Sequence, residues 1–325
     1  MDKDLYFSVT EPISEEFEYF KREYDRLFET DDPDLKPLLG QVRASRGKMM
    51  RPILMLLIAG YYRNFSSGIF RAANSLELLH TATLVHDDVV DNSFLRRGVP
   101  SVNSVFGNKL SVLLGDYLVS LALSEISATG VAENIECFSS LAKNLASGEI
   151  SQLSVKSSSV LSEEDYFRII TNKTASLFSF CAKIASLTCG ADSDGVCAFS
   201  EFGRLVGLCF QIRDDIFDYF NDESIGKPYG NDMSDGKITL PAIYALNNSA
   251  IDWSDAIRGI RNCSATADTI RNVTDFTLKN GGIEYAERVM KELGDKAVAC
   301  LPADMDYAVR KAFTDYVSLV ICRRR

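Results

Sequence analysis

Two aspartate clusters in this chain repeat one spacing. The first runs from His86 to Asp91 (HDDVVD) and the second from Asp214 to Asp218 (DDIFD). On a helix, Asp87 and Asp91 lie one turn apart on one face, and Asp88 turns away by about 100°. Like charges at that spacing destabilise a helix, so we expect cations to compensate. A hard ion such as Mg²⁺, which accepts one or two carboxylates and completes its shell with water and substrate phosphate, fits this need.

The clusters matter because they occur twice. A single aspartate pair in an acidic chain usually lies on a solvated helix face and has no further role. Each of these clusters follows a long apolar segment, so each is predicted at a helix C-terminus, where the helix dipole makes carboxylates still less favourable without cations. We therefore expect the two clusters to face each other across the mouth of one cavity.

Basic residues accompany both clusters. Taken singly, each is more typical of a surface cation than of a ligand. Together with two magnesium-type clusters, they describe a site for two polyphosphates, held partly through metal and partly by charge-assisted hydrogen bonds. These residues are Lys48, Arg51, Arg96, Arg97, Lys173, Lys227 and Lys237.

Helices must position these side chains. Apolar residues recur at three- and four-residue steps nearly everywhere, and glycine and proline total only 28 of 325 residues. We predict an all-α fold, a single domain over residues 1–325 that forms one large helical bundle with a central apolar cavity. The predicted helices span about 11–29, 52–63, 68–91, 103–127, 132–153, 163–189, 194–220, 238–247, 266–280, 282–299 and 304–321. The glycine-rich segment 221–237 is predicted to be a functional loop.

Composition excludes several other classes. A net charge of −10 argues against nucleic acid as a partner. The longest apolar run, Pro52 to Gly60, is too short to span a bilayer. No cysteine pair has CxxC spacing, and the acidic start Met1–Asp4 does not resemble a signal peptide, so we expect a cytoplasmic protein. We expect the basic tail Cys322–Arg325 to be solvated, with weak attraction to an anionic membrane surface as the alternative.

Seven ordered motifs carry a family resemblance. They run from Gly47 to Pro52, Leu79 to Asp91, Leu95 to Gly98, Gly148 to Gln152, Lys173 to Phe178, Phe210 to Asp215 and Gly236 to Pro241. In this order they resemble the trans-isoprenyl diphosphate synthases, most closely the long-chain polyprenyl (octaprenyl-type) branch. The resemblance covers about residues 40 to 245. One departure is Arg46, where the family usually has a second glycine before Lys48.

The resemblance implies a chemistry and its residues. The family joins an allylic diphosphate to isopentenyl diphosphate, head to tail, and releases pyrophosphate. It implies Mg²⁺ held by Asp87, Asp91 and Asp214, with Asp88, Asp215 and Asp218 in support. The allylic diphosphate would be bound by Arg96, Lys173, Thr174, Gln211, Lys227 and Lys237, of which Lys173 and Lys237 also assist catalysis. Isopentenyl diphosphate would be bound by Lys48, Arg51, His80 and Arg97.

The resemblance also implies an assembly and a product. Homodimers are common in the family, with helices near 103–127 and 132–153 in the interface. Residues four and five before the first cluster, Thr83 and Ala82, limit product length in this family, and both are small here. Leu79, Leu78 and Ser75 would come next below them. We therefore predict a product longer than geranylgeranyl diphosphate, hexaprenyl to nonaprenyl, for quinone side chains, with weak membrane-surface contact for its release.

Three alternatives remain at this point. The product could be shorter, as in farnesyl or geranylgeranyl diphosphate synthases. A class I terpene cyclase would share the fold and the first cluster, but it needs no isopentenyl diphosphate site and usually carries a different second motif. A non-catalytic partner subunit typically loses an aspartate cluster and carries CxxxC pairs, whereas both clusters are intact here and no CxxxC occurs.

Overall fold

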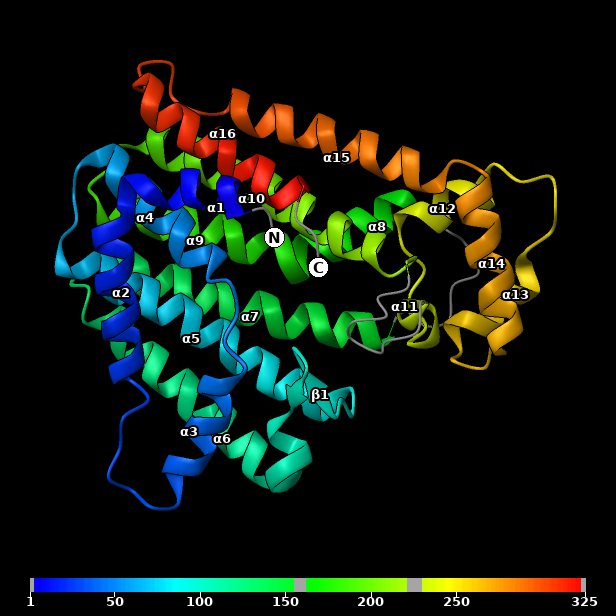
Figure 1. The fold of residues 1–325 in the computed structure, drawn as a ribbon, viewed down its shortest axis with the longest axis horizontal. Helices are drawn as coiled ribbons and strands as arrows, with labels where there is room; N and C mark the ends of the chain where they lie inside the picture. The colour runs from blue at the N-terminus through cyan, green and yellow to red at the C-terminus, as the bar shows by residue number, and fades with distance from the viewer. Residues whose placement is uncertain (1–2, 155–161, 221–229, 323–325) are drawn as a thin grey trace.

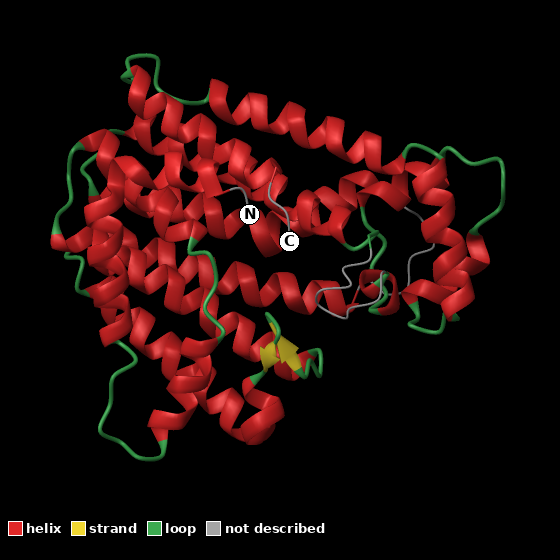
Figure 2. Ribbon diagram, viewed as in Figure 1, coloured by secondary structure: helices red, strands yellow, loops and turns green. Residues whose placement is uncertain are grey.

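The computed structural model describes residues 3–154, 162–220 and 230–322. Their regular secondary structure is almost entirely helical, which confirms the predicted all-α class (Figures 1 and 2). Among them, the one sheet is a hairpin of two-residue strands, β1 (Leu95–Arg96) and β2 (Val99–Pro100). Lys227 and the tail Arg323–Arg325 lie outside the described residues.

The helices follow in chain order. They are α1 (Lys3–Thr10), α2 (Ser14–Arg26), α3 (Leu35–Ala44), α4 (Met50–Tyr62), α5 (Ser67–Val90), α6 (Val102–Ser127), α7 (Ala132–Ser154), α8 (Glu163–Ile170), α9 (Ser176–Thr188), α10 (Ser193–Phe217), α11 (Asn231–Ser234), α12 (Leu240–Asn247), α13 (Ser254–Arg261), α14 (Ala267–Lys279), α15 (Gly282–Ala299) and α16 (Tyr307–Cys322). Within the described residues, two short helical segments join them, η1 (Glu11–Ile13) and the π-helical turn η3 (Thr171–Ala175).

Most predicted helices agree with these bounds to within a few residues. The continuous helix predicted over 163–189 is wrong, because η3 interrupts it between α8 and α9. A π-helical turn is wider than an α-helical turn and often marks a functional site. Here it carries Lys173 and Thr174. Helix α2 is shorter than the helix predicted over 11–29. The sequence does not predict α1, α3, α11 and α13.

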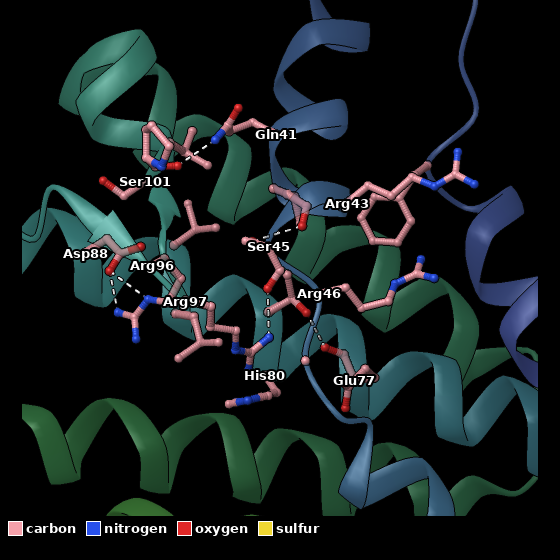
Figure 3. A pocket seen from close by; sticks show the side chains of 18 of the residues that line it. Gln41, Arg43, Ser45, Arg46, Glu77, His80, Asp88, Arg96, Arg97 and Ser101 are labelled. Atoms are coloured by element: carbon pink, nitrogen blue, oxygen red, sulfur yellow. Dashed lines mark hydrogen bonds and ion pairs between the residues drawn. The ribbon is translucent and has the colours of Figure 1, made fainter. Parts of the chain in front are cut away.

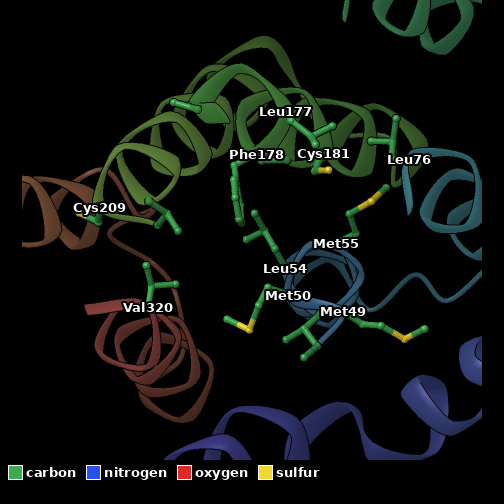
Figure 4. Packing of buried hydrophobic residues seen from close by; sticks show 14 of the residues in the cluster. Met49, Met50, Leu54, Met55, Leu76, Leu177, Phe178, Cys181, Cys209 and Val320 are labelled. Atoms are coloured by element: carbon green, nitrogen blue, oxygen red, sulfur yellow. The ribbon is translucent and has the colours of Figure 1, made fainter. Parts of the chain in front are cut away.

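The core is built around α9, which packs against α4 on one side and α10 on another (Figure 4). Helix α4 is apolar on all sides and is buried from Met50 to Ala59, as expected for a helix with no solvent face. Two glycines of α10 let it approach the preceding helix closely. A Cβ on Gly203 would lie 2.5 Å from the Phe178 carbonyl oxygen, and one on Gly207 would lie 2.6 Å from the Cα of Ala175. This contact fixes η3 against α10.

In the part of the chain that the structure describes, two helices, α6 and α10, are long and apolar enough to cross a membrane by length and composition alone. The core helix of a soluble protein passes the same test. Half of the apolar window of α10 is buried inside the molecule (50%), and that of α6 is 39% buried. The apolar side chains that α6 leaves exposed are considered below.

Candidate active site

The first aspartate cluster lies at the C-terminal end of α5. Asp88 is buried and accepts hydrogen bonds from the guanidinium of Arg96, with Nε of Arg96 3.0 Å from Oδ1 of Asp88 (Figure 3). The side chain of Asn103 donates to the backbone carbonyl of Asp88 at 3.0 Å. Asp88 therefore ties the end of α5 to the β1–β2 hairpin.

The other two carboxylates of this cluster belong to Asp87 and Asp91. Burial raises the pKa of Asp87 to about 6; the ammonium of Lys173 opposes this rise, and the carboxylates of Glu149 and Asp91 add to it. Nζ of Lys173 lies 2.7 Å from Oε2 of Glu149. The π-helical turn thus brings a cation to the end of α5, where one was expected.

The second cluster lies at the end of α10 within a buried hydrogen-bond network. Asp215 accepts from the hydroxyl of Tyr166 at 2.6 Å (Oδ2) and from Nε2 of Gln211 at 2.8 Å (Oδ1). The hydroxyl of Thr174 donates to Oε1 of Gln211 at 2.6 Å. Burial, reinforced by the carboxylate of Asp232, raises the pKa of Asp215 to about 8. Both side-chain oxygens of Asp215 are hydrogen-bonded inside the protein, and its supporting role at the metal stays a prediction.

Asp218 organises the segment that follows. Its Oδ1 accepts the backbone N–H of Asn231 at 3.1 Å, and its Oδ2 accepts that of Asp232 at 3.0 Å. The carboxylate therefore satisfies backbone donors at the start of α11. Burial, together with Asp218, raises the pKa of Asp232 to about 6, while Lys237 lowers it.

Lys237 links the two clusters electrostatically. Burial lowers its pKa, but the carboxylates of Asp232, Asp235 and Asp91 outweigh burial, so the pKa is raised. Asp91 belongs to the first cluster, and Asp232 follows the second. Since one ammonium interacts with both Asp91 and Asp232, the end of α5 and the start of α11 lie on the same side of the bundle. That the two clusters face each other across one cavity stays a prediction.

An arginine-rich pocket lies beside Asp88 (Figure 3). Among the predicted residues it is lined by His80, Arg96 and Arg97. Nη1 of Arg97 donates to the carbonyl of Ser45 at 2.8 Å. The guanidinium presses against Gly47, where a Cβ would lie 2.5 Å from Nη1 of Arg97. Arg96, predicted to bind the allylic diphosphate, lies here with the residues predicted for isopentenyl diphosphate.

Arg51 lies deeper and is buried. Its guanidinium packs over the ring of Phe178, 4.7 Å from the centroid. Burial lowers the pKa of Arg51, and the carboxylate of Glu77 acts in the opposite direction. Burial, with Arg51 and Arg97 adding to it, holds the pKa of His80 well below its usual range, so the imidazole is neutral. Lys48 is exposed in the loop before α4, next to Gly47.

A second pocket lies beside Asp215. It is lined by the predicted allylic-diphosphate residues of the described chain other than Arg96, namely Lys173, Thr174, Gln211 and Lys237. Apolar side chains of α8 and α12, including Ile170 and Ile243, complete its wall. Arg96 and Arg97 thus line the pocket beside Asp88, and Lys173 and Lys237 line the pocket beside Asp215. The other predicted cations of the described chain, Lys48 and Arg51, line neither pocket.

Comparisons with known proteins agree with this arrangement. The family model described as polyprenyl synthetase matches residues 33–274 of the chain. The chain belongs to the polyprenyl synthetase family. It is therefore a prenyltransferase, as the sequence motifs predict.

Individual relatives support this family assignment. Octaprenyl diphosphate synthase of Escherichia coli K12 is 33% identical over 283 residues, which cover 86% of this chain and 87% of that protein. The crystal structure of a geranylgeranyl pyrophosphate synthase from Bacteroides thetaiotaomicron is 41% identical, with a TM-score of 0.87 and coverage of 98% and 100%. A polyprenyl synthase from Caulobacter crescentus, complexed with calcium and isoprenyl diphosphate, is 28% identical, with a TM-score of 0.90 and 98% coverage of both chains.

The predicted chain-length residues of this polyprenyl synthetase lie along α5. Ala82, Leu78 and Leu79 are buried, and the hydroxyl of Thr83 donates to the carbonyl of His80 at 2.8 Å. Ser75 is buried against α6, where its hydroxyl donates to the carbonyl of Ala122 at 2.7 Å. These residues line neither of the two pockets described above, and their influence on product length remains a prediction.

Sequence reasoning missed three residues of the site. Asp232 was only one acidic residue in a loop, although its position between Asp218 and Lys237 could have flagged it. Tyr166 and Glu77 lie on helices, and the sequence alone shows nothing of the partners that bury them. Glu77 faces the guanidinium groups of the arginine-rich pocket and has a raised pKa, with burial as the main cause.

Proposed function

We propose that this protein is a Mg²⁺-dependent trans-polyprenyl diphosphate synthase that adds isopentenyl diphosphate to an allylic diphosphate. The observation that carries the proposal is the pairing of two cationic pockets with two aspartate clusters. Lys173 and Lys237 line one pocket, and His80 and Arg97 line the other. Two separate anion sites match an enzyme with two diphosphate substrates. A terpene cyclase binds one diphosphate substrate and would need only one such site.

The aspartates suit a divalent metal. Asp87, Asp91 and Asp214 are the proposed ligands, and hard cations prefer such carboxylate oxygens. The Caulobacter relative, crystallised with calcium and isoprenyl diphosphate, supports a divalent ion beside the substrate. Bound there, Mg²⁺ would neutralise charge on the leaving pyrophosphate.

The side chains of the protein account for the remaining steps. Lys173 and Lys237 bind the allylic diphosphate and stabilise the negative charge that develops as its C–O bond breaks. Arg97 and the neutral His80 hold isopentenyl diphosphate so that its double bond attacks the allylic carbocation. No described side chain is an obvious general base, so the released pyrophosphate takes the proton. Apolar walls exclude water from the cation.

The product is proposed to be long, hexaprenyl to nonaprenyl diphosphate, for quinone side chains. The similarity to octaprenyl diphosphate synthase and the small, buried Ala82 support this length. The 41% identical Bacteroides structure, named as a geranylgeranyl pyrophosphate synthase, makes a C20 product the principal alternative. We further propose a cytoplasmic enzyme whose surface contacts membranes weakly during product release.

A homodimer is proposed through α6 and α7. Leu110, Leu113 and Tyr117 lie on one face of α6 and are 43%, 62% and 39% exposed. Ile135 on α7 is also exposed. Contiguous apolar side chains of this kind are typical of subunit interfaces. Leu113→Asp should shift the protein from dimer to monomer in sedimentation experiments, whereas Ile251→Asp, at an exposed apolar residue elsewhere, should not.

The deciding experiment is an assay of the purified chain alone with Mg²⁺, isopentenyl diphosphate and farnesyl or geranylgeranyl diphosphate, followed by mass analysis of the product. We expect polyprenyl diphosphates longer than C20 and loss of activity in Asp87→Ala. Asp295→Ala, an exposed aspartate on α15, is the matched control. Retained activity in Asp87→Ala would overturn the metal assignment. A product of C20 or shorter would overturn the chain length, and inactivity of the chain alone would favour a partner-subunit role.

A further inference from the structure

Arg46 is the departure from the family pattern, and its side chain is anchored to α2. Its guanidinium forms an ion pair with Asp25 and lies 5.2 Å from the ring centroid of Tyr24. The side chain is only 25% exposed. An arginine has thus replaced the usual glycine without pointing freely into solvent, and it joins the α3–α4 loop to two consecutive residues of α2.

The anchor on α2 is itself fixed to the site. Tyr24 is buried, and its hydroxyl lies 3.2 Å from Oγ1 of Thr81 on α5. Its ring packs edge-on against Phe28, with centroids 5.1 Å apart. Both rings line the arginine-rich pocket. Because Tyr24 is held by α5, whose end carries the first aspartate cluster, the contact with Arg46 has a rigid support.

The residues on either side of Arg46 both touch Arg97. The carbonyl of Ser45 accepts the hydrogen bond from Nη1 of Arg97 at 2.8 Å. On the other side, Gly47 is so close that a Cβ there would lie 2.5 to 2.6 Å from three atoms of the guanidinium. Any movement of the loop at Arg46 would therefore carry both contacts with it.

We propose that Arg46 is a positioning residue of the isopentenyl diphosphate site: its contacts with Asp25 and Tyr24 fix the Ser45–Gly47 loop and thereby the guanidinium of Arg97. The inference rests on the proposed function, which assigns Arg97 to that substrate. Glycine at this position would leave the backbone more conformational freedom. An ion pair combined with stacking on an aromatic ring restricts it.

The test compares substitutions at Arg46 by steady-state kinetics. In Arg46→Gly, KM for isopentenyl diphosphate should rise about three- to tenfold, where tenfold corresponds to about 1.4 kcal/mol. KM for the allylic diphosphate and kcat should stay within about twofold. Arg46→Lys, which keeps a charge for Asp25, should recover part of the loss. Asp25→Asn should act in the same direction, and the double variant with Arg46→Gly should be less affected than the sum of the two.

The control residue, Arg22, lies on α2, the helix that carries Tyr24 and Asp25. Arg22 is exposed, and its guanidinium lies 6.0 Å from the ring of Tyr19, away from the pocket. Arg22→Ala should leave both KM values unchanged. An unchanged KM for isopentenyl diphosphate in Arg46→Gly, or equal rises for both substrates, would overturn the inference, as would a comparable effect of Arg22→Ala.

A readout independent of turnover separates this inference from the proposed function. In a crystal structure of Arg46→Gly, the guanidinium of Arg97 should have left the carbonyl of Ser45. An intact bond at its present length would refute the positioning role, whatever reaction the enzyme catalyses. Failure of the wild-type chain to elongate an allylic diphosphate would instead refute the proposed function.

Discussion

Gly47→Ala is the substitution that most directly tests how the arginine-rich pocket holds its ligand. A Cβ at Gly47 would lie 2.5 Å from Nη1, 2.6 Å from Cζ and 2.6 Å from Nη2 of Arg97. Ordinary contacts between such atoms begin near 3.5 Å, so the guanidinium must move by about 1 Å. Arg97 itself has a φ of 53° and is followed by Gly98 with a φ of 81°, so its backbone is committed to a tight turn. The side chain must therefore absorb the movement.

The expected magnitude follows from the bond that this movement breaks. Nη1 of Arg97 would lose the carbonyl of Ser45, now 2.8 Å away, and with it the orientation of the guanidinium. A hydrogen bond involving a charged group contributes about 1.5–3 kcal/mol. If the same orientation binds a diphosphate, KM for isopentenyl diphosphate should rise about 10- to 150-fold. The free energy of unfolding should fall by no more than the contribution of this hydrogen bond, about 1.5–3 kcal/mol, because the displaced atoms end a flexible side chain.

Steady-state kinetics with each substrate varied in turn, together with chemical denaturation, would measure both effects. Gly40→Ala is the matched control, since Gly40 lies in α3 and a Cβ there meets nothing within 4 Å. Replacing a helical glycine by alanine should stabilise the protein by up to about 1 kcal/mol and leave both KM values unchanged. If Gly47→Ala kept a wild-type KM for isopentenyl diphosphate, the contact between Ser45 and Arg97 would not be the arrangement that binds substrate.

Three further predictions concern the contacts of Asp215, the titration of Asp87 and the chain-length residue Ala82. Tyr166→Phe removes the donor to Oδ2 of Asp215 and should lower the free energy of unfolding by about 1–3 kcal/mol at neutral pH, measured by denaturation; an unchanged midpoint would contradict the network. Burial raises the pKa of Asp87 from 3.8 to about 6, so its contribution to the stability of the metal-free protein is present at low pH and is lost as pH rises from 4 through 6. Because metal ligands must be deprotonated, Mg²⁺ should bind more tightly at pH 7.5 than at 5.5 in calorimetric titrations, and equal affinities would argue against Asp87 as a ligand. Ala82→Tyr should shorten the products while leaving activity, as judged by mass analysis, and unchanged lengths would remove Ala82 as a determinant.

The helices that could be predicted from the sequence are those with long, uninterrupted apolar periodicity. The predicted helix 68–91 corresponds to α5 at Ser67–Val90, and the predicted helix 282–299 coincides with α15. The π-helical turn could not be predicted in the same way. Its position depends on the close approach of α10 through Gly207, a contact between segments more than thirty residues apart.

In the site, too, residues in short sequence motifs could be predicted, whereas residues placed by contacts between distant segments could not. Asp87 and Asp214 could be identified because their spacing recurs within short segments. Asp232 carries a weaker sequence signal, because its burial depends on the cap that Asp218 provides to α11. The assignment of cations to two pockets also required the structure. Arg96 was predicted to bind the same substrate as Lys173, but it lines the pocket that contains His80.

Position within each aspartate cluster decides what the carboxylate does. Asp88 and Asp215 are the second members of their clusters, and each is only 3% exposed. The helical rotation of about 100° between neighbours turns this second position away from its cluster partners. A buried carboxylate is costly unless it is hydrogen-bonded, which explains why Arg96 bonds Asp88 and why Tyr166 bonds Asp215. The guanidinium of Arg96 therefore already binds Asp88. If Arg96 also binds a diphosphate, it must do so while it keeps its hydrogen bonds with that carboxylate.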